Sequence, residues 1–207
     1  MRVAVDALAV YIHKDNPIKC LSLAQIDAIF SKTRKRGLKS EIKTWGEVGA
    51  KGEWAALPIS TYGRNSASGT YGYFKEVALA DGDYKDSVKE QAGSSAVVQG
   101  VASDKGAIGY SGIGYRTADV KALDVSGKDG DACHHPSQEE AYAGNYPITR
   151  FLYVYVNKNP GRPLEPTRAE FIKFVLSKQG QQITVKDGYY PLPAAVASED
   201  SKMLGLN

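Results

Sequence analysis

The sequence predicts an α/β fold, because strand-like and helix-like segments alternate along the chain. Residues 3–12 are mostly apolar, as expected of a buried strand or of two strands that cross a core. Ser22 follows and is suited to cap a helix, since the apolar residues after it recur at helical spacing. These apolar residues are Leu23, Ile26, Ile29 and Phe30.

Three later segments predict further strands. Residues 57–62 and 107–110 are short runs that favour strands, and residues 151–156 are the strongest such run in the second half of the chain. Residues 112–114 hold two glycines and predict a bend. Segments that predict helices lie between these runs, which is the order expected of an α/β sheet.

Three helices are expected beside these strands. One spans residues 70–79, and a shorter one opens at Gly93. A third begins at a capping box formed by Thr167 and Glu170 and ends near Gly180. Their apolar faces hold Tyr71, Phe74, Val77 and Ala78 in the first helix, Val97, Val98 and Val101 in the second, and Phe171, Phe174 and Val175 in the third.

Two polar stretches interrupt this pattern. Residues 32–37 are strongly basic and close the helix that follows Ser22. Basic residues beside a helix C-terminus are ordinarily solvated surface that compensates the helix dipole, and we prefer this interpretation to a nucleic-acid patch. Residues 126–145 are polar and glycine-rich, and they are expected to form a long loop or a domain boundary.

The composition restricts the class of protein. The 207 residues fit one large domain or two modest lobes, and 43% hydrophobic with 24% charged residues is ordinary for a globular chain. The 26 basic and 23 acidic residues give a net charge of +3, which is too weak to indicate a nucleic-acid partner. No apolar run approaches the roughly 18 residues that a membrane span needs. Two cysteines supply neither a disulfide framework nor a four-cysteine zinc site.

The loop before the 70–79 helix carries the clearest functional signal. It contains Arg64 and leads into Ser68, Gly69 and Thr70 at the start of the helix. The first N–H groups of a helix lack partners within the helix and lie at the positive end of its dipole. Gly69 would let a ligand approach the backbone, the two hydroxyls add donors, and the guanidinium fits a tetrahedral oxyanion. The loop therefore predicts an anion-binding site.

The same residues have a purely structural interpretation. Ser68 would then be an ordinary N-cap, Gly69 a turn residue and Arg64 a surface charge. The arginine four positions ahead of the Ser-Gly-Thr, at a strand-to-helix junction, favours the anion site. The loop lacks the Gly-Lys-Ser/Thr ending of a P-loop, which argues against an NTPase.

Five segments of the chain resemble, in order, the phosphate-binding proteins of bacterial phosphate ABC transporters. They are residues 3–17, 21–31, 62–70, 106–110 and 187–193. The resemblance implies a type II periplasmic-binding-protein fold, in which two α/β lobes joined by hinge strands clamp phosphate between them. In that family the arginine and the Ser-Gly-Thr of the helix start bind phosphate, and the corresponding residues here are Arg64, Ser68, Gly69 and Thr70.

The resemblance also implies a division of the chain. Residues 7–112 are expected to form a central α/β lobe with the anion-binding helix start, and residues 1–6 and 113–207 the hinge strand and the C-terminal part of the other lobe. The family's chains begin well before the segment that matches Met1, so the first lobe is expected to be incomplete in this chain. A missing segment or a second chain would complete it and supply the family's other phosphate-contacting hydroxyls.

One departure from the family bears on selectivity. Many relatives carry an aspartate in the loop where this chain has Ser66, and the family's proton-accepting aspartate lies in the missing part. An acceptor carboxylate admits phosphate, which carries a proton, and repels sulfate, which does not. Asp6, on the expected hinge strand, is the candidate acceptor here. The alternative for Asp6 is a buried, hydrogen-bonded structural aspartate.

The implied function is that of a solute receptor. It would bind inorganic phosphate in a cleft between the lobes and deliver it to the membrane permease of a phosphate ABC importer, in the periplasm or outside the cell. Residues 1–6 contain no hydrophobic region of a signal peptide. No cofactor, nucleic-acid partner or enzymatic activity is expected.

Two alternative functions stay open. One is a structural or adhesive protein that keeps the binding-protein fold with weak or no ligand binding. The other is a phosphoester hydrolase with Ser68 as nucleophile, although no histidine or carboxylate lies at a motif-like spacing to activate it.

Histidine and cysteine residues add two smaller expectations. His134 and His135 follow Cys133, but adjacent rings on a polar loop rarely converge on one ion, so no metal site is expected. Cys20 and Cys133 are far apart in sequence, and the sequence leaves open whether they are bonded in an oxidising compartment.

Overall fold

The structure is a computed structural model that describes residues 1–206, and it divides into two compact units. The central unit is Leu8–Ile148, and the terminal unit joins Met1–Ala7 to the chain from Thr149 onward. The chain passes from one unit to the other at two places, first within a strand after Ala7 and again after Ile148. No helix of residues 1–206 has both the length and the apolar content that a membrane span requires.

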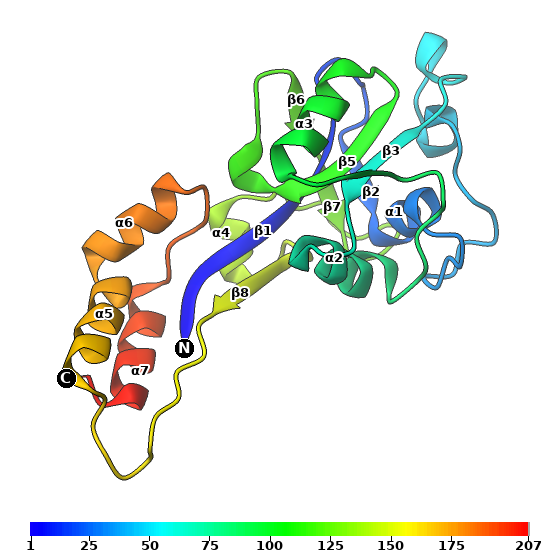
Figure 1. Ribbon diagram of the computed structural model, residues 1–207. Helices are drawn as coiled ribbons and strands as arrows, with labels where there is room; N and C mark the ends of the chain where they lie inside the picture. Colours follow the sequence, from blue (N-terminus) through cyan, green and yellow to red (C-terminus); the bar gives the residue numbers. More distant parts are fainter. Residues whose placement is uncertain (207) are drawn as a thin grey trace. The chain divides into compact units, whose positions relative to one another are not determined.

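The central unit is built on a mixed sheet in the order β4-β3-β5-β1-β6 (Figure 1). Its strands are β1 (Arg2–His13), β3 (Ser60–Arg64), β4 (Lys89–Gln91), β5 (Ala107–Gly112) and β6 (Val120–Ala122). β3 runs parallel to both β4 and β5, whereas β1 is antiparallel to β5 and β6. A separate parallel pair joins β2 (Cys20–Ser22) to β7 (Asp124–Ser126). The predicted α/β class is therefore confirmed, and the run 3–12 is one strand rather than two.

One face of this sheet is covered by α1 (Leu23–Phe30) and α2 (Gly69–Leu79). On this face Tyr110 of β5 stacks against Phe74 of α2, with ring centroids 3.8 Å apart, and Phe30 of α1 meets both rings edge-on. Ser22 caps α1, as predicted, and the structure adds a capping box with Gln25 that was not predicted. The aromatic packing fixes α2, and with it the loop that precedes α2, against the sheet.

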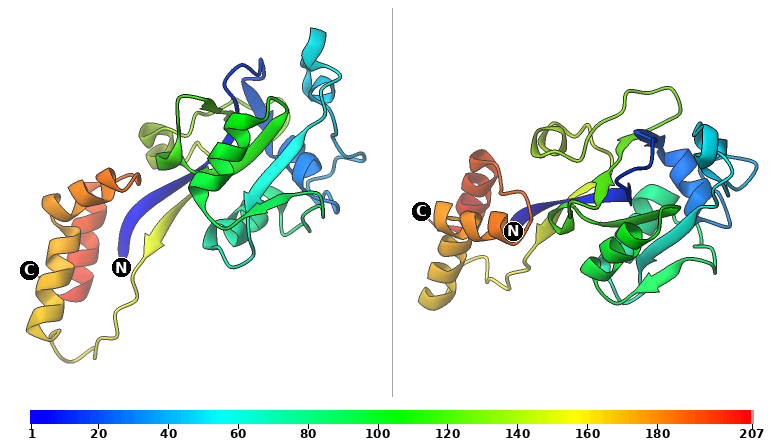
Figure 2. Two further views of the ribbon diagram at one scale, coloured as in Figure 1. Left: turned by 45° about the horizontal axis from the view of Figure 1, so that its top comes forward. Right: turned by 90° about the horizontal axis from the view of Figure 1, so that it is seen from above.

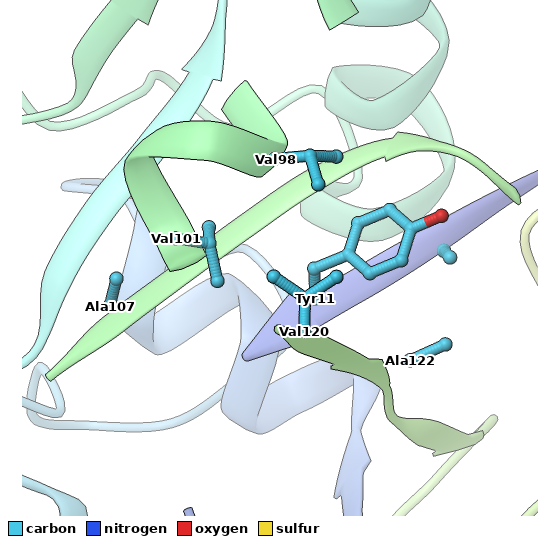
Figure 3. Packing of buried hydrophobic residues seen from close by; sticks show 7 residues of the cluster. Tyr11, Val98, Val101, Ala107, Val120 and Ala122 are labelled. Carbon is cyan, nitrogen blue, oxygen red and sulfur yellow. The ribbon is translucent and has the colours of Figure 1, made fainter. Parts of the chain in front are cut away.

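The opposite face is covered by α3 (Ser94–Ser103), as Figure 3 shows. This helix begins where the sequence predicted one. Gly109 lies on this face, and a Cβ there would come within 2.8 Å of Val101 and 3.0 Å of Val97. The missing side chain thus lets α3 approach β5 closely. The buried cluster between helix and sheet comprises Ala9, Tyr11, Val98, Val101, Ala107, Val120 and Ala122.

The basic turn after α1 contains an arginine with a specific contact. The helix ends at Phe30, and Arg36 donates from Nε to the Ala78 carbonyl at 2.8 Å and from Nη2 to the Val77 carbonyl. Arg36 therefore caps the C-terminal end of α2, which is favourable for a cation at that end of a helix dipole. The expectation of solvated surface was wrong for this half-buried residue.

The polar stretch 126–145 is ordered and belongs to the central unit. It contains α4 (Gln138–Ala143), whose N-cap Ser137 accepts the backbone N–H of Glu140. A disulfide joins Cys133 to Cys20 of β2, and Val125 exchanges backbone hydrogen bonds with His134. These ties, together with the pairing of β6 with β1, extend the central unit to Ile148, beyond the division that we drew at residue 112.

The terminal unit pairs the first half of β1 with β8 (Thr149–Tyr153) in antiparallel register. Three helices gather beside this pair, α5 (Pro166–Leu176), α6 (Lys178–Lys186) and α7 (Ala194–Leu204) (Figure 2). Three short 3-10 helices lie in the central unit, at Trp45–Val48, Gly52–Trp54 and Ile113–Tyr115.

The prediction of a single helix from Thr167 to Gly180 was wrong, because two helices, α5 and α6, cover this segment. Pro166 occupies the first turn of α5, and the Glu165 carboxylate accepts the first backbone N–H groups, so the predicted Thr167 cap is not used. Ser177 then interrupts the helix, because its hydroxyl oxygen caps α6 by accepting the Gly180 N–H at 3.2 Å. A Cβ at Gly180 would lie 2.2 Å from the Phe174 carbonyl, so glycine permits the tight junction of α5 and α6.

Candidate anion-binding site

The candidate site lies where β3 and β4 end side by side. Arg64 is the last residue of β3 and pairs in register with Gln91, the last residue of the parallel strand β4. α2 follows β3 onto one face of the sheet, and α3 follows β4 onto the other. Neighbouring parallel strands whose helices diverge in this way form a topological switch point, which is where open α/β sheets bind ligands.

Arg64 is half-buried and is held by the start of α3. Its Nη1 donates to the Ser94 hydroxyl at 2.8 Å, and its Nη2 donates to the Ala92 carbonyl at 3.2 Å. Its Nε is buried and has no hydrogen-bond partner among residues 1–206. Within the same range of residues, no carboxylate lies at ion-pair distance from the guanidinium. The positive charge of Arg64 is therefore oriented by neutral groups and left without a counter-ion.

Ser68 forms the N-cap of α2, as the sequence predicted. Its Oγ accepts the backbone N–H of Thr70 at 3.1 Å, and its own N–H closes a turn onto the Asn65 carbonyl at 3.0 Å. The cap uses a lone pair of the hydroxyl, so the O–H hydrogen is still available to a ligand. The turn places Ser66 and Ala67 at an exposed tip and returns the chain to the helix start.

Gly69 lies at the exposed start of α2, next to open space. Apart from its chain neighbours and the backbone of its own helix, no heavy atom of the described residues lies within 4 Å of the position that a Cβ would occupy, and the backbone does not adopt the left-handed region that favours glycine. Conformation and packing thus do not require a glycine at this position, and the backbone of the helix start is open to an external group. The half-buried Thr70 follows it in the first turn.

The structure brings together four of the five candidate residues. Arg64, Ser68, Gly69 and Thr70 form one continuous turn of the central unit, while Asp6 belongs to the terminal unit. The Asp6 Oδ2 lies 3.2 Å from both Nε and Nη2 of Arg150 on the paired strand β8. Burial raises the pKa of the Asp6 carboxyl above its usual value, and Arg150 acts against this shift. These contacts favour the structural alternative for Asp6.

A second polar site in the central unit is less suited to an anion. A cavity of about 380 Å³ is lined by three lysines and by three carboxylates, so its lining is neutral overall. Each lysine is already paired, Lys32 with Asp86, Lys75 with Asp83, and Lys85 with Glu41. An anion would compete with these ion pairs, whereas Arg64 forms no ion pair with a carboxylate within the described part of the chain.

Sequence reasoning missed Ser94 as part of the site. The sequence feature that could have identified Ser94 is its position after Gly93, at the start of a helix that follows a strand. The contact with Arg64 joins residues 30 positions apart, which no local pattern reveals.

The two histidines after Cys133 pair with different carboxylates. His134 Nδ1 lies 2.8 Å from Glu140, and His135 Nδ1 lies 2.7 Å from Asp124. The pairs stabilise the loop that the disulfide anchors. Their rings do not converge on a common point through these contacts.

The chain has two compact units, and in the central one an arginine without a carboxylate partner among residues 1–206 precedes a capped helix start at the switch point of the sheet, as in ligand-binding α/β domains. A family model described as a PBP superfamily domain matches residues 1–179, and the chain belongs to this superfamily. It is 57% identical over 204 residues to the phosphate-binding protein PstS of Pseudomonas aeruginosa, a match that covers 99% of the chain and 63% of that relative. Protein SphX of Synechococcus elongatus is 31% identical over 196 residues, with 93% of the chain and 55% of that relative covered.

Solved structures show the same likeness. A possible phosphate binding protein of Planctomyces limnophilus superposes with a TM-score of 0.78 at 30% identity, covering 99% of this chain and 71% of that one. A candidate phosphate ABC transporter substrate-binding protein of Clostridium perfringens, solved with bound phosphate, gives a TM-score of 0.72 at 30% identity, with 93% and 71% covered. The chain spans less than two thirds of the length of the curated relatives named above.

Proposed function

We propose that this protein binds inorganic phosphate as the solute receptor of a phosphate ABC importer, and that Arg64, Ser68, Gly69 and Thr70 contact the anion. The observation that carries the proposal is the half-buried Arg64, which has no carboxylate partner among the residues that the structure describes and lies in one turn with the capped start of α2. The names of the Pseudomonas and Clostridium relatives support phosphate as the ligand.

Each residue contributes a separate interaction to this site. The planar guanidinium of Arg64 offers several donors and a full positive charge to the phosphate oxygens. The Ser68 and Thr70 hydroxyls donate hydrogen bonds, and Gly69 lets an oxygen approach the first turn of α2, where the helix dipole is positive. Phosphate oxygens accept hydrogen bonds in all directions, so donors from a turn and an arginine fork match its shape.

The receptor role includes contact with a membrane permease, in the periplasm or outside the cell. The disulfide between Cys20 and Cys133 supports an oxidising compartment. Exposed aromatic residues of the terminal unit, Phe171 at 61% and Phe174 at 45%, support an additional segment or second chain that completes this lobe.

The hydrolase alternative has little support in the contacts of Ser68. A serine nucleophile needs a base within hydrogen-bond reach, but the partner of Ser68 Oγ is the backbone N–H of Thr70. His134 and His135 are engaged with carboxylates near the disulfide.

Isothermal titration of the 207-residue chain with phosphate tests the proposal. We expect saturable heat from the wild type and a loss of affinity of at least about tenfold in Arg64→Ala, since charge-assisted hydrogen bonds are the stronger ones. Arg116→Ala is the charge control, because this substitution removes the same charge at an exposed position outside residues 64–70. Unchanged binding in Arg64→Ala would overturn the site assignment, and no heat from the wild type would favour the structural or adhesive alternative.

A further inference from the structure

Arg64 receives its orientation from a second strand-helix unit. β4 ends at Gln91, and the chain passes through Ala92 and Gly93 into Ser94, the first residue of α3. The Ala92 carbonyl and the Ser94 hydroxyl each accept one hydrogen bond from the two terminal nitrogens of Arg64. The end of β4 and the start of α3 thus hold the guanidinium at two points.

We propose that Ser94 is a positioning residue that pre-orients Arg64 for an anion, an inference that rests on the proposed function. An arginine side chain loses considerable rotamer freedom when a ligand fixes it, and this loss weakens binding. Because Ser94 already fixes Nη1, part of the rotamer freedom of Arg64 is lost when the protein folds and not when the anion binds. A guanidinium has five N–H donors, so two bonds to the α3 start leave the others for the ligand.

The chemistry of the two acceptors matters as much as their position. A carboxylate at this place would also orient Arg64, but it would neutralise the charge and compete with an incoming anion. A hydroxyl and a carbonyl carry no net charge, so the positive charge of Arg64 stays available. The structure therefore combines orientation with an uncompensated charge, which suits an anion that must enter and leave.

The neighbouring Ser95 provides a matched control. It lies one position further along the first turn of α3 and is exposed, whereas Ser94 is half-buried against Arg64. Both serines occupy the first turn of the same helix, so alanine should affect helix formation similarly at either position. A difference in anion binding between the two variants then reports the contact with Arg64.

Four variants, Ser94→Ala, Ser94→Thr, Ser94→Asp and Ser95→Ala, test the proposal by phosphate titration. We expect Ser94→Ala to weaken binding about three- to tenfold, the range expected when one side chain must be ordered on binding. Ser94→Thr keeps the hydroxyl and should bind as the wild type does, as should Ser95→Ala. Ser94→Asp should weaken binding more than Ser94→Ala, even though an acidic residue in the first turn favours the helix.

A second measurement reports the position of Arg64 directly. Nitrogen relaxation of the Arg64 Nε–H group in the ligand-free protein should show a more mobile side chain in Ser94→Ala than in the wild type or in Ser95→Ala. Equal phosphate affinity of Ser94→Ala and Ser95→Ala, or unchanged Arg64 mobility in Ser94→Ala, would overturn the positioning role while leaving the proposed function intact. Absence of phosphate binding by the wild type would overturn the proposed function itself.

Discussion

Asp200 of α7 binds Arg2 at the start of β1 through three hydrogen bonds. The backbone N–H and Nε of Arg2 donate to Oδ2 at 2.6 and 3.2 Å, and Nη2 donates to Oδ1 at 2.9 Å. Asp200 is only 2% exposed, so this contact ties the last helix to the first strand within the terminal unit. Burial acts to raise the pKa of Asp200, but the hydrogen bonds and charge of Arg2 outweigh it and hold the pKa below its usual value.

This contact predicts a pH-dependent contribution to stability. A carboxyl whose pKa is lowered by folding stabilises the native state above its unfolded pKa, about 3.9, and loses that effect as the pH falls through the folded value. Asp200→Asn should therefore lower the free energy of unfolding by about 2 kcal/mol at pH 7, as expected for hydrogen bonds to a charged group. Denaturant unfolding of both proteins from pH 7 down to pH 3 checks this. The difference in the free energy of unfolding between Asp200→Asn and the wild type should shrink below about pH 4.

Glu199 is the control for this effect, because it also pairs with Arg2 but its side chain is 70% exposed. Glu199→Gln should lower the free energy of unfolding by less than about 1 kcal/mol, as is usual for an exposed ion pair. A cost for Asp200→Asn that is independent of pH would show that packing, and not charge, accounts for the contact.

A substitution at Gly69 should separate binding from stability. Gly69→Ala meets no neighbouring atom and needs no unusual backbone angle, so we expect the free energy of unfolding to stay the same or rise by up to about 1 kcal/mol. Phosphate affinity should fall by about tenfold or more, since the methyl group occupies the space through which an anion reaches the backbone.

Gly72 is the matched control, because it lies one turn further along α2 and also has open space around it. Gly72→Ala should gain similar stability and keep phosphate affinity. If Gly69→Ala binds phosphate as tightly as Gly72→Ala, the helix start does not contact the anion.

The disulfide should stabilise the central unit without affecting the site. Replacing both Cys20 and Cys133 by serine opens a loop of 113 residues, and we expect a loss of about 2–4 kcal/mol in the free energy of unfolding. The bond ties β2 to the loop before α4, whereas Arg64 is held by the start of α3. Calorimetric titration should thus give unchanged phosphate affinity at a temperature where the variant is folded, and a large affinity loss would show that this loop supports the site.

Anion selectivity tests whether Asp6 is a structural residue or the group that accepts the proton of the ligand. Because its Oδ2 is held by Arg150, we expect Asp6→Asn to leave the ratio of phosphate to sulfate affinity unchanged. Competition titrations of the variant and the wild type with both anions measure this ratio. A marked gain in sulfate binding by the variant would identify Asp6 as the group that accepts the proton of the ligand.

Local signals in the sequence were sufficient for the start of α2 and for its cap. Ser68, Gly69 and the helical spacing that follows act within one turn, and the structure confirms the helix and the hydrogen bond from Thr70 to Ser68. The helix after residue 165 shows where local signals compete, since Pro166 and Glu165 formed a stronger start than the Thr167 capping box that we chose.

Relations between distant residues could not be obtained in the same way. Whether Cys20 meets Cys133, and whether Arg64 meets Ser94, depends on the order of strands in the sheet, which no short pattern encodes. The resemblance to a family identified the arginine and the helix start, but it said nothing about the residue that orients the arginine. The features that could not be predicted, the Cys20–Cys133 bond and the Arg64–Ser94 contact, therefore depend on long-range packing.

Equilibrium dialysis of the 207-residue chain against labelled phosphate, with and without excess sulfate, tests the central claim most directly. We expect saturable binding of one phosphate per chain that Arg64→Ala abolishes or greatly weakens, and the sulfate arm shows whether this chain alone discriminates between the two anions. No saturable binding by the wild type, or equal binding by the wild type and Arg64→Ala, would contradict the assignment of this chain as a phosphate receptor that uses Arg64.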